Sequence, residues 1–194
     1  MTKEQIIEIG DLHYADMERL GWIDPAKSNV HYATLVICEI CEAIQAHRKG
    51  HVHTTMAIAP ELLAETVDDK DYPEVLFRHD FEFYCKDTTA DELADTFLRL
   101  LSLYWMRSYD KMFLLDNLDT HVPNGTFTSQ AMRAMRMLTA EHRQDSPSDW
   151  QIARSIGYVV RWAETLGIDL LVSCRRKMRY NKTRPDWRVG EKQY

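Results

Sequence analysis

The feature that most constrains this fold is the scarcity of helix breakers in a chain whose apolar residues recur with helical spacing. The 194 residues include only 7 Gly and 6 Pro. Between these breakers lie segments of roughly 16–20 residues with apolar positions three and four residues apart, and alternating apolar and polar runs are largely missing. Because such segments are longer than ordinary strands, we expect helices over the ranges 3–20, 29–48, 89–109, 127–143, 147–166 and 168–182.

This pattern predicts an all-α fold, a helical bundle of about five or six helices. The length suits a single domain, 1–194, with a basic C-terminal tail over 175–194. Segment 51–88 has the least regular periodicity, and we expect it to be an irregular insertion. Within it we expect a short helix at 60–67, while the mixed apolar and charged residues from Val75 to Tyr84 admit a strand.

Two helix starts carry recognisable capping chemistry. Thr88 followed by Asp91 resembles a capping box, in which a hydroxyl and a carboxylate satisfy the first free backbone N–H groups. That assignment leaves Glu92 available for another role. Ser146 before Pro147 fits an N-cap followed by proline at the first helical position.

Charge and hydropathy exclude several classes of protein. The chain has 24 Lys+Arg against 30 Asp+Glu, a net charge of −6, whereas a general nucleic-acid binder is normally basic. No apolar run approaches the ~18 residues of a membrane span, and the N-terminus carries scattered acids instead of the apolar core of a signal peptide. With four cysteines and no leader, we expect reduced thiols in a cytoplasmic protein that binds neither membranes nor nucleic acid.

The helix expected at 29–48 is apolar around almost its whole circumference, yet it contains Glu39 and Glu42. Residues three apart lie on the same side of a helix, one turn from each other. Buried glutamates are rare unless they are paired, protonated or bound to a metal. Since Lys and Arg are absent from 33–46, a metal ion is the better candidate for the cation between them.

The helix expected at 89–109 repeats this spacing with Glu92 and Asp95. Both acids lie off the apolar arc of the helix, so a solvated face with Asp95 paired to Arg99 is one interpretation. The other is that the two carboxylate pairs act together. Four carboxylates without a histidine partner suit a hard, oxygen-liking cation, Mg²⁺ or Mn²⁺.

The C-terminal segment is strongly basic. From Arg175 to Arg184 there are six cations and no acid, and Lys177 and Asn181 lie one helical turn apart. Residues 1–174 hold 16 Lys+Arg and 28 Asp+Glu, a net −12, while residues 175–194 hold 8 and 2, a net +6. The cations complement a helix C-terminus in one interpretation, and in the other they bind a polyphosphate.

Three segments together resemble the all-α nucleoside triphosphate pyrophosphatase superfamily, the MazG-like group that includes dimeric dUTPases. They are EICEAIQAHRKG at 39–50, DELADTFLRLLSL at 91–103, and KMRYNKTRP at 177–185 with the closing GEKQY. The family motif, ExxE followed by a spacer and ExxD, maps onto Glu39, Glu42, Glu92 and Asp95. The sequence departs from the family in a longer spacer, 49 residues, and in Cys38 where several relatives have a further glutamate. Segments 51–88 and 110–165 carry little of the resemblance.

The resemblance implies an enzyme that hydrolyses a nucleoside triphosphate between the α and β phosphates, with a role in nucleotide-pool house-cleaning. The four carboxylates would be catalytic ligands of Mg²⁺, with Mn²⁺ as the alternative. The implied substrate-binding residues are Lys177, Asn181 and Arg184 for the phosphates, Tyr180 close to them, and Trp22 for the base. Family members commonly form homodimers or homotetramers, and the wide apolar circumference of the two acidic helices favours the same assembly here.

Two other functional classes stay open from the residues. His51, His53 and the pair His79–Asp80 resemble elements of the HD-type metal-dependent phosphohydrolases, which are also all-α. A non-catalytic helical interaction module would use the same charges as solvated faces. The CxxC formed by Cys38 and Cys41 we interpret as small apolar filler within the helix, since a single pair without a second one is a weak metal or redox signal.

Overall fold

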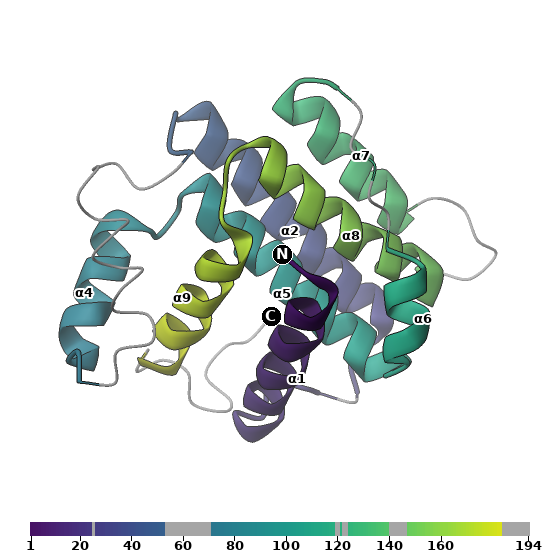
Figure 1. The fold of residues 1–194 in the computed structure, drawn as a ribbon, viewed down its shortest axis with the longest axis horizontal. Helices are drawn as coiled ribbons and strands as arrows, with labels where there is room; N and C mark the ends of the chain where they lie inside the picture. The colour runs from purple at the N-terminus through teal and green to yellow at the C-terminus, as the bar shows by residue number, and fades with distance from the viewer. Residues whose placement is uncertain (25, 53–70, 119–120, 122–123, 140–146, 184–194) are drawn as a thin grey trace.

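The computed structural model describes residues 1–24, 26–52, 71–118, 121, 124–139 and 147–183, and every structural statement here concerns these residues. Their regular structure is entirely helical, which confirms the predicted all-α class. No described helix combines the length and the hydropathy needed to cross a membrane. The helices, drawn in Figure 1, are α1 (Lys3–Arg19), α2 (Asn29–Arg48), α4 (Glu74–Tyr84), α5 (Thr89–Arg107), α6 (Lys111–Asp116), α7 (Phe127–Thr139), α8 (Asp149–Thr165) and α9 (Leu170–Thr183).

The long helices lie where the apolar periodicity predicts them, and α2 has the predicted bounds. Helix α8 starts later than expected: its N-cap is Ser148, whose side chain accepts a hydrogen bond from the backbone of Gln151, and the Gln151 side chain completes the capping box. The expected N-cap Ser146 lies outside the described residues. So does the helix expected at 60–67.

The strand admitted from Val75 to Tyr84 is wrong, because these residues form α4. Phe77 and Phe81 are four residues apart, so they share one helix face, and both are fully buried there. They form a separate apolar cluster with Cys85 and with Tyr180 of α9. The predicted insertion therefore contains a helix docked on α9, at the edge of the molecule (Figure 1).

Helix α5 is the centre of the bundle. Of its 19 residues 14 are buried, and it packs against α1, α2, α8 and α9, with its most extensive contact to α2. Figure 1 shows α5 running through the middle of these helices, with α7 over α2 and α8 at one side. Close packing extends to α1, where Gly10 lies against the ring of Trp105. Side chains of α5 therefore face α2 on one side of the helix and α9 on another.

Candidate functional site

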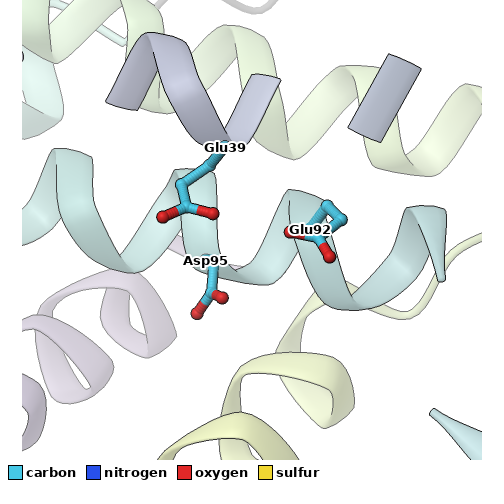
Figure 2. A group of neighbouring side chains, drawn as sticks. All are labelled: Glu39, Glu92 and Asp95. Atoms are coloured by element: carbon cyan, nitrogen blue, oxygen red, sulfur yellow. The ribbon is translucent and has the colours of Figure 1, made fainter. Parts of the chain in front are cut away.

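Three carboxylates from α2 and α5 come close to one another. Glu39 comes from α2, and Glu92 and Asp95 come from adjacent turns of α5. One oxygen from each lies within 4.8 Å of the others. Figure 2 shows Glu39 pointing from α2 toward α5 and Asp95 pointing away from α2. We call these three residues the carboxylate cluster.

Glu42, the fourth carboxylate predicted from the sequence, lies at the margin of the carboxylate cluster. It is exposed on α2, but it is close enough for its charge to raise the pKa of both Glu39 and Glu92. The structure thus brings the two predicted carboxylate pairs together, with three members in the cluster and the fourth on its solvent side.

Two cations, one from α5 itself and one from α9, reach the carboxylate cluster. Arg99 of α5 donates from Nε to Glu39 Oε1, and Lys177 of α9 lies with its Nζ 2.7 Å from Asp95 Oδ2. Glu39 therefore has a cation beside it in the folded protein, although no cation is near it in the sequence. Asp95 has Lys177 as its partner, and Glu39 has Arg99, so both carboxylates are charge-paired.

Glu92 differs from both of them. Its side chain is buried, at 4% exposure, which makes the interpretation of this helix side as a solvated face wrong. Burial, with the nearby charges of Asp91 and Asp95, raises the pKa of Glu92 to about 9. Among the described residues its carboxyl has neither a hydrogen bond nor an ion pair. A buried, unpartnered acid aimed at two other carboxylates is a group that needs either a proton or a metal ion.

The donor set of the carboxylate cluster fits the cation that the sequence predicts. All of its ligand atoms are carboxylate oxygens, which Mg²⁺ and Mn²⁺ prefer. The three oxygens already lie within 4.8 Å of one another. Burial raises the pKa of Glu39 as well, against the opposing charge of Arg99. A divalent cation would offset the burial, and the smaller carboxylate repulsion, that raise both pKa values.

Asp91 is a residue of this site that the sequence analysis assigned to helix capping. Thr88 does cap α5 by accepting from the backbone N–H of Asp91, but the carboxylate of Asp91 holds Lys177, with Oδ1 and Oδ2 at 2.9 and 3.0 Å from Nζ. It also accepts from the backbone N–H of Asp87. The signal in the sequence is the four-residue spacing of Asp91 and Asp95, which places both on one helix face toward the same lysine.

The remaining substrate-binding candidates lie on two sides of α9. Asn181 is buried, its Oδ1 has no hydrogen-bond partner among the described residues, and it lines a small hollow together with Trp22 and His13. Burial lowers the pKa of His13 to about 4, even though the charge of Asp95 opposes the shift. Tyr180 instead faces α4, where its hydroxyl donates to Glu82 at 3.1 Å. Arg184 lies outside the described residues.

The described residues behind the alternative interpretations are not members of the carboxylate cluster. His79 is exposed on α4, with Nδ1 3.2 Å from the neighbouring Asp80, and His53 lies outside the described residues. His51 contributes its backbone carbonyl, which accepts from Thr89 at the start of α5. Cys38 and Cys41 are both exposed, so the interpretation of this pair as apolar filler is wrong.

Comparison of the chain with family models, with curated proteins and with solved structures finds no match in any of the three.

Proposed function

We propose that this protein is a Mg²⁺-dependent nucleoside triphosphate pyrophosphohydrolase that releases a nucleoside monophosphate and pyrophosphate. The observation that carries the proposal is Glu92, a buried carboxyl close to Glu39 and Asp95 that has no partner among the described residues. The resemblance of the ExxE, ExxD and KMRYNKTRP segments to the MazG-like group supplies the reaction, and the donor set supplies the metal.

The chain offers a distinct group for each requirement of this reaction. Glu39, Glu92 and Asp95 would hold the cation, and the exposed Glu42 would add negative charge at its open side. A bound Mg²⁺ would neutralise phosphate charge and activate a water molecule for attack on phosphorus. Lys177 would donate its N–H groups to phosphate oxygens, because it lies directly beside Asp95.

The small hollow between α1 and α9 has room for about one water molecule, so the nucleoside part of the substrate would bind there after the side chains that line it move apart. Trp22 offers a ring. Asn181, expected from the sequence to bind phosphate, lies beside Trp22 instead and offers an amide whose oxygen has no partner among the described residues. An aromatic ring and an amide together can stack on a base and hydrogen-bond to it. The hollow adjoins Lys182 and Met178 of the same helix that carries Lys177, so base and phosphate contacts would both come from α9.

Incubation with a panel of nucleoside triphosphates and Mg²⁺, followed by product identification, tests the proposal. We expect monophosphate and pyrophosphate; release of diphosphate and orthophosphate would contradict cleavage between the α and β phosphates. Glu39→Gln and Glu92→Gln should each abolish turnover while circular dichroism shows an intact fold. Glu8→Gln, at an exposed site on α1, is the matched control and should keep full activity.

Two further measurements separate the proposal from the alternatives. A helical interaction module without a metal predicts no Mg²⁺- or Mn²⁺-dependent thermal shift, whereas the carboxylate cluster predicts stabilisation by either ion. An HD-type phosphohydrolase predicts that His79→Ala abolishes activity. Because His79 is exposed on α4 and away from the cluster, we expect this variant to be fully active.

A further inference from the structure

The ammonium group of Lys177 occupies a closed, charged compartment beside the carboxylate cluster. Lys177 is buried, at 7% exposure, and its Nζ lies within 3.0 Å of oxygens from both Asp91 and Asp95. The rings of Phe81 and Tyr180 lie 5.7 and 5.9 Å from the same nitrogen. Aromatic faces at this distance attract a cation and exclude water from it.

The two carboxylates on Lys177 are not equivalent. Asp95 belongs to the carboxylate cluster, and its oxygen is one of the three that lie within 4.8 Å of one another. Asp91 lies outside that cluster and is buried behind Lys177, where it also accepts from the backbone N–H of Asp87. A metal ion in the cluster would therefore bind Asp95, and Lys177 would keep Asp91 as its partner.

The insertion that contains α4 helps to build this compartment. Phe81 of α4 stacks on Tyr180 at a centroid distance of 4.3 Å, and the guanidinium of Arg179 lies 4.4 Å from the centre of the Phe77 ring. The Arg179 side chain also donates to the backbone carbonyl of Tyr72, just before α4. These contacts fix α9 against α4, and they hold the Lys177 backbone at the level of Asp91 and Asp95.

We propose that Lys177 is the resident counter-cation of Asp95, that it competes with the divalent metal for this carboxylate, and that Asp91 is the positioning residue that retains it when the metal binds. This inference rests on the proposed function, since it concerns the same cation. Once Asp95 turns to the metal, an ammonium still held by Asp91 lies next to the bound cation with one of its N–H groups released. That is where the phosphate of a metal-bound triphosphate would accept a hydrogen bond.

Competition by Lys177 and its retention by Asp91 predict that substitutions of these two residues change the Mn²⁺ affinity in opposite directions. Lys177→Met removes the competitor, so Mn²⁺ should bind about tenfold more tightly or better, although turnover is lost. Asp91→Asn leaves Lys177 with Asp95 as its remaining carboxylate, so Mn²⁺ should bind more weakly. In the Lys177→Met background, Asp91→Asn should weaken binding much less, because there is no longer a lysine to retain.

The test is a titration of the nucleotide-free protein with Mn²⁺, followed by electron paramagnetic resonance of the free ion. Lys182→Met is the matched control, because it removes the same charge from α9 but its partner is Asp16, 2.7 Å from Nζ; its Mn²⁺ affinity should match the wild type. Circular dichroism checks folding, and Lys177→Gln replaces the Met variant if that variant is unfolded.

The outcomes separate this inference from the proposed function. If the wild type binds no Mn²⁺, the metal site and the inference both fail. If the wild type binds Mn²⁺ but removal of Lys177 leaves the affinity unchanged or lowers it, the metal site stands and the competition is refuted. Equal weakening by Asp91→Asn with and without Lys177 would refute the retaining role of Asp91.

Discussion

Replacement of the most perturbed acid of the site, Glu92→Gln, should stabilise the metal-free protein. The Glu92 carboxyl is buried and unpartnered among the described residues, beside Asp91 and Asp95, with the more distant Glu42 adding to the repulsion and Lys177 opposing it. Gln has nearly the same shape and carries no charge. The substitution therefore removes an electrostatic cost without leaving a cavity.

The size of the effect follows from proton linkage. The Glu92 carboxyl has an ordinary pKa of 4.5 in the unfolded chain and a pKa of about 9 in the folded protein. Because the folded pKa is raised, the contribution of Glu92 to stability is fully present below pH 4.5 and is lost as the pH rises toward 9. At pH 7 the loss spans about 2.5 pH units, or about 3 kcal/mol.

Chemical and thermal unfolding in EDTA between pH 5 and 8.5 measures this difference. We expect Glu92→Gln to exceed the wild type by about 3 kcal/mol at pH 7, a rise in Tm of about 6–12 °C for a chain of this length. The gain should shrink toward pH 5 and grow toward pH 8.5. The exposed control Glu8→Gln should change stability by less than about 1 kcal/mol at every pH.

Two results would refute this reasoning. A Glu92→Gln variant that is no more stable than the wild type at pH 7 would show that the buried carboxyl is compensated. A gain that does not vary with pH would show that its origin is packing and not charge. Addition of Mg²⁺ should reverse the order, because the wild type gains binding energy that the variant lacks.

Two further predictions concern packing and the thiols. Gly10→Ala should destabilise the protein by about 1–3 kcal/mol in urea unfolding despite the better helix propensity of alanine, since a Cβ at this position would lie 2.4 Å from the Trp105 ring; an unchanged or higher midpoint would contradict the close contact. Cys38 and Cys41 should react with a thiol reagent faster than the two buried cysteines do. Equally slow reaction of all four would show that the α2 face is covered.

Much of the fold could be predicted from the chain because helix formation depends on near neighbours. Helix α2 begins and ends where predicted, with Ser28 as its N-cap and Lys49 as its C-cap, since an amphipathic period and a capping residue act within a few positions. The prediction failed at α4, because the positions of Phe77 and Phe81 fit one face of a strand as well as one face of a helix. Its partner, Tyr180, is about a hundred residues away in the chain.

The amino-acid sequence by itself determined the long helices and the spacing that places Glu92 and Asp95 on one side of α5. Only the tertiary structure decided the charge environment of these acids. The hydrogen bond from Arg99 to Glu39 joins residues 60 apart, and the one from Lys177 to Asp91 joins residues 86 apart. Ionisation depends on burial and on charges within a few ångströms. Those distances arise when α2, α5 and α9 pack together, and no local pattern encodes them.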